Sequence, residues 1–116
     1  MSKIITLNRN SDFRRLYACG KCNKDPALVT YVRKNRAGIC RIGITVSKKI
    51  GNAVMRNRTK RIIRAAYVQC QPLIKGNWDI VFVARFKTPH LKSTDLYSVM
   101  LKQFSGAGLI QKEDKQ

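Results

Sequence analysis

The sequence has very little negative charge. Its 116 residues include six Asp or Glu against 24 Lys or Arg, which gives a formal net charge of +18. No acidic residue occurs between Asp25 and Asp79, a stretch that holds twelve of the basic residues. A charge of this sign and size predicts an anionic partner, either nucleic acid or an anionic membrane surface.

Long hydrophobic runs are also absent. No apolar stretch approaches the roughly 20 residues that a membrane span needs, and the N-terminus has no signal-peptide core. Membrane is therefore the weaker of the two partners, and we expect a cytoplasmic protein. The hydrophobic fraction of 44% argues against a wholly disordered basic tail. At this length we expect residues 1–116 to form a single domain with its own core.

The sequence lacks a recognisable catalytic constellation. Its acids are scattered and form no paired site for metal-assisted phosphodiester cleavage. The acids are Asp12, Asp25, Asp79, Asp95, Glu113 and Asp114. The single histidine, His90, has no acid at motif spacing, and no phosphate-binding or dinucleotide-binding glycine motif occurs. The residues predict binding and no catalytic side chain.

Cysteine is too sparse for a complete metal site. The four cysteines are Cys19, Cys22, Cys40 and Cys70, and they include one CxxC pair. A zinc site would need a second pair or nearby histidines, and a thioredoxin-like motif would begin a helix, whereas this pair follows one. We expect four unpaired thiols and no bound metal. A zinc-binding module that uses Cys19 and Cys22 is the alternative.

The predicted elements alternate between helices and strands. Residues 1–10 form an extended lead-in, with Ile4, Ile5 and Leu7 able to cover an edge of the core. A first helix begins at Ser11 as N-cap and ends at Gly20. A polar loop over 21–26 leads to a hairpin of strands 27–34 and 39–46. A helix over 53–70, capped by Asn52, comes next. It is followed by a central strand over 78–86 and a helix over 94–104 capped by Ser93 or Thr94. This order predicts an α+β fold with helices layered on one sheet.

The helix over 53–70 carries two distinct faces. At about 100° per residue, the polar side chains share one arc of roughly 140°. They are Arg56, Asn57, Lys60, Arg61 and Arg64, and Arg58 flanks the edge of the apolar arc. The apolar arc, roughly 100° wide, comprises Met55, Thr59, Ile62, Ile63, Ala66 and Cys70. No acid relieves the like-charge repulsion, so a polyanion such as RNA is expected to supply the negative charge.

Three aromatic residues precede this helix, and two interpretations of them remain open. Phe13 and Tyr17 lie at helical spacing with Leu16, a stripe that is typical of core packing. Tyr31 lies on a predicted strand and is either a core residue or an exposed platform. Beside a basic groove, such rings would stack unpaired bases, at about 1–3 kcal/mol each.

The segment SKKIGNAVMRNRTKRIIRAAY resembles the bacterial ribonuclease P protein subunit. The match is centred on Arg56-Asn57-Arg58 and is specific, because Lys, Gly-Asn-Ala-Val, Arg-Asn-Arg and Lys-Arg follow in order over about twenty positions. Upstream support comes from Asp12-Phe13 with Tyr17 and Gly20, and the resemblance covers roughly residues 8–104. The CxxC pair is not part of the family pattern.

The resemblance implies a fold and a division of labour. The implied fold is a two-layer αβββαβα sandwich with a mainly antiparallel four-stranded sheet and a left-handed βαβ crossover. The implied partners are the ribonuclease P catalytic RNA and precursor tRNA, with no obligate protein partner. The RNA, with its own Mg²⁺, would remove the 5′ leader, and the protein alone would bind no cofactor.

The resemblance also assigns residues to the two RNAs. Contacts to the catalytic RNA would come from Lys48, Lys49, Arg56, Asn57, Arg58, Lys60, Arg61 and Arg64. The single-stranded leader would lie against Phe13, Tyr17 and Tyr31. Two further hypotheses explain the charge without this assignment: a ribosomal or RNA-chaperone protein, and a nuclease that needs no RNA subunit.

Overall fold

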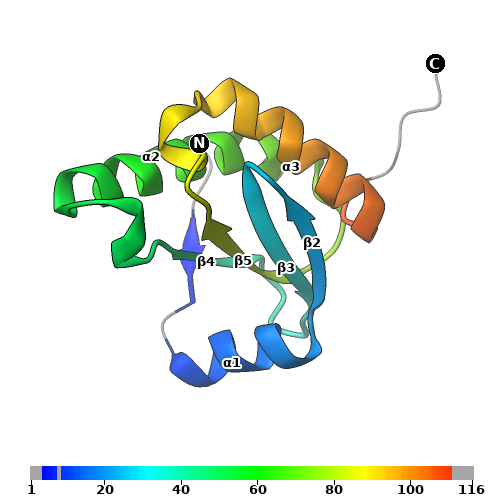
Figure 1. Cartoon of the computed structure of the whole chain (residues 1–116). Helices are drawn as coiled ribbons and strands as arrows, with labels where there is room; N and C mark the ends of the chain where they lie inside the picture. Colours follow the sequence, from blue (N-terminus) through cyan, green and yellow to red (C-terminus); the bar gives the residue numbers. More distant parts are fainter. Residues whose placement is uncertain (1–3, 8, 111–116) are drawn as a thin grey trace, which may run out of the picture.

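The computed structural model describes residues 4–7 and 9–110. In chain order its main elements are β1 (Ile5–Thr6), α1 (Asn10–Cys19), β2 (Lys21–Asp25), β3 (Leu28–Lys34), β4 (Arg41–Thr45), α2 (Ala53–Cys70), β5 (Trp78–Ala84) and α3 (Ser93–Ala107). Short 3-10 turns, Lys48–Ile50, Gln71–Leu73 and Thr88–His90, connect them. This is the predicted α+β class, with helices packed on a sheet (Figure 1).

The sheet is mixed and has the strand order β1-β4-β5-β3-β2. Strand β5 lies at its centre, antiparallel to β3 and parallel to β4. The predicted hairpin between the strands over 27–34 and 39–46 is therefore wrong, because β5 lies between them. The true hairpin joins β2 to β3 across Asp25–Leu28. With the two-residue β1, the sheet has five strands where four were expected.

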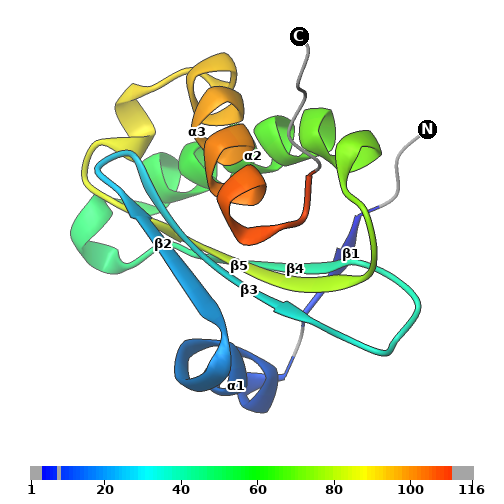
Figure 2. The ribbon, with the colours of Figure 1, turned by 90° about the vertical axis from the view of Figure 1, so that its right-hand side faces the viewer.

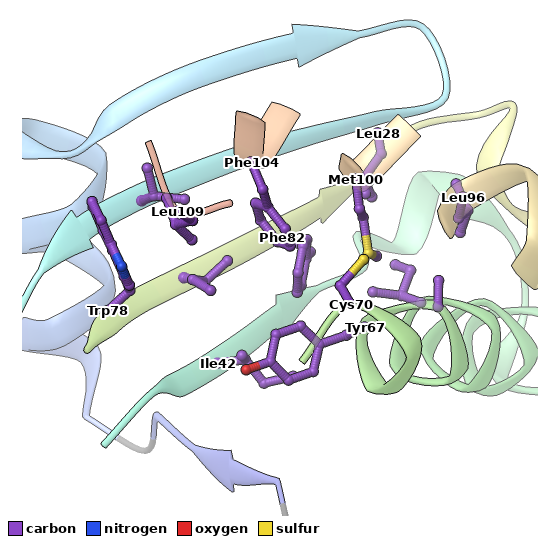
Figure 3. Close-up of a cluster of buried hydrophobic side chains, with 14 of the residues drawn as sticks. Leu28, Ile42, Tyr67, Cys70, Trp78, Phe82, Leu96, Met100, Phe104 and Leu109 are labelled. Carbon is purple, nitrogen blue, oxygen red and sulfur yellow. The ribbon is translucent and has the colours of Figure 1, made fainter. Parts of the chain in front are cut away.

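Helices cover both faces of the sheet, which differs from the two layers expected (Figure 2). Helices α2 and α3 lie on one face, and α1 lies alone on the other (Figure 1). The unit β4-α2-β5 joins two parallel neighbours. Figure 3 views the sheet from the α2 side, with β4 and β5 both pointing to the right and β5 above β4. When the strands are turned to point up, β5 lies to the left of β4, so the crossover through α2 is left-handed. Right-handed crossovers are the general rule.

The main core lies between the sheet and the helices α2 and α3 (Figure 3). Phe82 of β5 is fully buried and contacts the rings of Tyr67 and Phe104 at centroid distances of 5.9 and 6.1 Å. Burial raises the pKa of the Cys70 thiol in this core to about 12, so that thiol stays protonated at neutral pH. A smaller core of Leu7, Leu16 and Val81 attaches α1 to the opposite face.

Several element ends differ from the prediction by a few residues. Helix α1 begins at Asn10 with Arg9 as N-cap, not at Ser11. Helix α3 begins at Ser93 after the N-cap Lys92, whose backbone N–H donates to Asp95 Oδ2 at 3.0 Å. Residues 21–25 form β2 where a loop was expected, and β5 ends at Ala84 instead of residue 86. Helix α2 and its N-cap Asn52 match the prediction.

Candidate nucleic-acid interface

Helix α2 separates its two faces as its sequence pattern predicted. Thr59, Ile63, Ala66 and Cys70 are buried against the core together with Tyr67, which the pattern had not placed there. Of the polar side chains predicted for the cationic face and its edge, those that are exposed are Asn57, Arg58, Lys60, Arg61 and Arg64. Arg56 is half-buried, and its Nε is buried without a hydrogen-bond partner in the described structure.

The start of α2 is fixed by local hydrogen bonds. The Asn52 side chain accepts from the Met55 backbone N–H at 2.9 Å, and the Thr59 hydroxyl donates to the Met55 carbonyl at 2.8 Å. Gly51 precedes this cap with φ of 151°, a conformation that disfavours other residues, and a Cβ there would meet Met55 at 3.0 Å. The chain therefore turns sharply into the helix.

The first turn of α2 carries no negative charge. It contains no acidic residue, so nothing there offsets the positive end of the helix dipole. Lys48 and Lys49 are exposed in the preceding 3-10 turn. Basic side chains and a helix N-terminus at one place attract phosphate groups.

The three aromatic residues lie together where α1 meets the sheet. Phe13 packs over Gly43 of β4, because a Cβ on Gly43 would stand only 2.5 Å from the ring. The rings of Tyr17 and Tyr31 meet edge to face at 5.0 Å between centroids. The Tyr17 hydroxyl also shares a 3.0 Å hydrogen bond with the Thr45 hydroxyl, and Tyr17 is 41% exposed.

Tyr31 stands beside the thiol of Cys22, its directly opposite residue on β2. The pKa of Tyr31 is raised above its ordinary value, first by a side-chain hydrogen bond with Cys22 and then by burial. The phenol therefore remains neutral at physiological pH. A neutral ring suits stacking against a base, because no phenolate charge repels the nucleic acid.

A pocket of about 190 Å³ extends from Phe13 to α2, and Tyr17 and Tyr31 do not line it. Its lining residues come from β1, α1, β4 and α2 and the segment after β1: Thr6, Leu7, Phe13, Ile42, Gly43, Ile44, Lys60 and Arg64. Two of the predicted basic residues and one predicted aromatic residue thus share one concave surface. The other predicted basic residues, Lys48 and Lys49 among them, do not line this pocket.

The sequence interpretation missed Gly43 and Thr45 as neighbours of the aromatic residues. Both lie on the α1 face of β4, two residues apart, because side chains of a strand alternate between its faces. The signal was present in the spacing of Arg41, Gly43 and Thr45. Without the strand order, however, β4 could not be placed under α1.

The described residues contain no group of three or more His, Cys, Asp or Glu that could hold a metal ion. All four cysteines are free, with Cys19 and Cys22 exposed. Within the described part of the chain, no helix is long and apolar enough to cross a membrane.

Known proteins resemble the chain over most of its length. A family model for ribonuclease P matches residues 1–108. The ribonuclease P protein component of Clostridium botulinum (strain Langeland) is 36% identical over 104 residues, covering 89% of this chain and 94% of that protein. The ribonuclease P protein component of Clostridioides difficile (strain 630) is 42% identical over 91 residues, covering 78% of this chain and 80% of that protein.

Solved structures agree with this assignment. The RNase P protein of Staphylococcus aureus superposes with a TM-score of 0.80 at 30% identity, covering 94% of this chain and all of that one, 100%. The RNase P protein from Thermotoga maritima superposes with a TM-score of 0.76 at 27% identity, covering 93% and 97% of the two chains. The chain therefore belongs to the ribonuclease P family, whose protein components take part in tRNA processing.

Proposed function

We propose that this chain binds the catalytic RNA of ribonuclease P and the 5′ leader of precursor tRNA, and so promotes removal of the leader. The cationic face of α2, with Lys48 and Lys49, binds phosphates of the catalytic RNA, and its Lys60 and Arg64, which line the pocket beside Phe13, also contact the leader. Phe13, Tyr17 and Tyr31 bind the single-stranded leader. The RNA carries out the hydrolysis with the Mg²⁺ that it binds.

The pocket shared by Phe13, Lys60 and Arg64 is the observation that carries this proposal. A leader strand on the aromatic residues reaches the basic side chains of α2 without leaving the surface of the protein. Arg offers a planar fork with two parallel hydrogen bonds to a phosphate, and Lys offers a point charge. Together these groups suit the backbone and the bases of one unpaired strand.

The division of labour follows from the side chains that are present. Phosphate contacts position an RNA without reading its sequence. Base stacking on aromatic rings contributes about 1–3 kcal/mol per base and tolerates any base. These are the properties expected of a protein that serves many precursor tRNAs, while the chemical step belongs to the RNA.

A double-mutant cycle tests the continuity of the two surfaces. Phe13→Leu and Arg64→Ala are each expected to weaken the binding of precursor tRNA to the holoenzyme, relative to mature tRNA. Because one leader strand contacts both residues, the double variant is expected to lose less than the two single losses combined, with a coupling of at least about 0.5 kcal/mol.

Lys102→Ala provides the matched control for this cycle, because Lys102 is exposed on α3. Its effect is expected to add to that of Phe13→Leu without coupling. Additive losses for Phe13→Leu with Arg64→Ala would contradict a single strand crossing both sites. Melting temperatures of all variants separate binding losses from unfolding.

A further inference from the structure

A second basic pocket, of about 450 Å³, lies on the α1 face of the sheet. Five cationic side chains and one carboxylate contribute to it, together with two residues of the turn after β3. The lining residues are Arg15, Arg33, Lys34, Asn35, Arg36, Ala37, Arg41 and Asp79. None of them belongs to the RNA-binding or leader-binding sets assigned above.

The floor of this pocket is rigid. Asp79 accepts two hydrogen bonds from Arg41, at Nε and a terminal nitrogen, both at 2.8 Å. It also accepts one from the Asn35 side-chain amide at 2.8 Å. Asn35 accepts from the Ala37 backbone N–H at 2.9 Å, which fixes the turn that carries Arg36. The pocket's single carboxylate is thereby committed to Arg41 and Asn35.

The other cations of the pocket have no acidic partner in the described structure. Arg33 is the register partner of Asp79 across β3 and β5, but the ion pair of Asp79 is formed with Arg41. Lys34 lies over the ring of Trp78, with its Nζ 5.8 Å from the centroid. Arg33, Lys34 and Arg36 are all exposed. Like charges that converge on one hollow repel one another unless an anion enters it.

The pocket is remote from the start of α2. The turn between β3 and β4 lies at one end of the sheet, and the 3-10 turn that leads into α2 lies at the other (Figure 2). In α1, Arg15 is two residues from both Phe13 and Tyr17, which places it about 160° around the helix axis from either ring. The Arg15 side chain therefore points away from the rings of Phe13 and Tyr17.

We propose that this pocket binds a phosphate group of RNA, as a second backbone contact distinct from α2 and from the aromatic site. The proposal rests on the proposed function, because it requires that the chain bind RNA. The guanidinium groups that line the pocket match the oxygens of a phosphodiester. Two contacts at opposite ends of the sheet would fix the orientation of the protein on the RNA. They would also raise its affinity, because the second contact forms at a high effective concentration once the first is made.

The test uses Arg33→Gln with Arg36→Gln, which removes two cations and leaves the Arg41–Asp79 pair intact. Affinity for a bacterial ribonuclease P RNA is measured at several salt concentrations, and the affinity of the reconstituted holoenzyme for precursor tRNA is measured in parallel. Lys87→Gln with Lys102→Gln is the control, because it removes the same charge from exposed positions that do not line the pocket. Arg61→Ala reports on α2.

Loss of one phosphate contact is expected to weaken binding about tenfold and to lower the slope of log affinity against log salt by about 0.7–0.9. A loss confined to the ribonuclease P RNA identifies that RNA as the source of the phosphate, and a loss confined to precursor tRNA identifies the substrate. If the pocket variant matches the control with both RNAs, the proposal is overturned. If Arg61→Ala also has no effect, the proposed function fails as well.

Arg36→Gln alone keeps the test independent of folding. The Arg36 side chain makes no hydrogen bond or ion pair within the described chain, so this variant is expected to unfold at the wild-type temperature. It is expected to lose part of the affinity and part of the salt slope. Wild-type binding by Arg36→Gln, together with wild-type binding by the double variant, would exclude a phosphate in this pocket.

Discussion

Gly43→Ala tests how α1 is seated on the sheet. Gly43 is buried beneath Phe13, and a Cβ on it would lie 2.5 Å from the ring Cζ and 2.6 Å from Cε1. Carbon atoms in contact are normally about 3.5–4.0 Å apart. The ring must therefore move by about 1 Å or more, and because Phe13 packs with Leu16 and Val81, α1 must move with it.

The cost of this displacement can be bounded. Inserting one methyl group into a packed site typically costs about 1–3 kcal/mol. For a domain of this size, that corresponds to a fall in the melting temperature of about 4 °C per kcal/mol. The free energy of unfolding in urea measures the loss. The moved ring is also expected to weaken precursor tRNA binding relative to mature tRNA.

Two further variants isolate the cause. In a Phe13→Leu background the clash is relieved, so Gly43→Ala is expected to cost at least about 0.5 kcal/mol less than in the wild type. Gly106→Ala is the matched control, because Gly106 lies in α3 and a Cβ there would meet nothing within 4 Å. It is expected to stabilise the protein by about 0.4–1 kcal/mol. An equal cost of Gly43→Ala in both backgrounds would refute the packing of Phe13 on Gly43.

Four other variants probe the remaining sites. Arg61→Ala is expected to weaken binding to ribonuclease P RNA and to reduce the salt slope by about one unit, because it removes a phosphate contact. Tyr17→Ala and Tyr31→Ala are each expected to cost about 1–3 kcal/mol in precursor tRNA binding, with little loss for mature tRNA, because each removes a stacking ring. Cys19→Ser with Cys22→Ser is expected to leave the rate of precursor cleavage unchanged.

Each of these has an outcome that contradicts it. An unchanged salt slope for Arg61→Ala, equal to that of Lys102→Ala, would exclude a phosphate contact at that position. If Tyr17→Ala and Tyr31→Ala weaken the binding of precursor and mature tRNA equally, a leader site at the tyrosines is excluded. Tyr17→Phe is the conservative control, because it keeps the ring and removes only the hydroxyl. A large loss of cleavage by the variant Cys19→Ser with Cys22→Ser would restore the zinc-module hypothesis. The metal content of the wild-type protein would then be measured.

Helix α2 could be predicted from the sequence because local signals agree there. The Asn52 cap, the helical period of buried residues such as Thr59 and Ile63, and Pro72 after the last turn all indicate the same boundaries. Strand β5 was also predicted as central, since WDIVFVA is apolar on both faces apart from Asp79. Helices α2 and α3 bury Phe82 on one face of β5, and α1 buries Val81 on the other face.

Strand pairing could not be predicted in the same way. The turn over 35–38 favours a hairpin locally, but burying both faces of β5 requires a strand on each side of it. Strands β3 and β4 provide those two sides. Strand β2 (KCNKD) was missed because it has no β-branched or aromatic residue. Its position is set by pairing with β3 and by tertiary contacts such as Gln103 Nε2 donating to the Asn23 carbonyl at 3.1 Å.

The sequence indicated the kinds of residue in the candidate site but only part of its arrangement. The exposed positions of the cationic face of α2 depend on helical period alone and were predicted, except that Arg56 is half-buried. The meeting of Phe13 with Lys60 and Arg64 depends on α1 and α2 reaching the same edge of β4 from opposite faces. The basic pocket around Asp79 depends on three strands in register. Neither arrangement leaves a local signal in the sequence.

Reconstituted cleavage measures whether this chain promotes removal of the 5′ leader. The purified chain is mixed with a bacterial ribonuclease P RNA at low Mg²⁺ and near-physiological salt, and cleavage of a precursor tRNA is followed. We expect cleavage at the 5′ end of the mature tRNA to rise sharply over that of the RNA alone, while the protein alone cleaves nothing. Binding to the RNA with no change in cleavage, or cleavage by the protein alone, would exclude the proposed function.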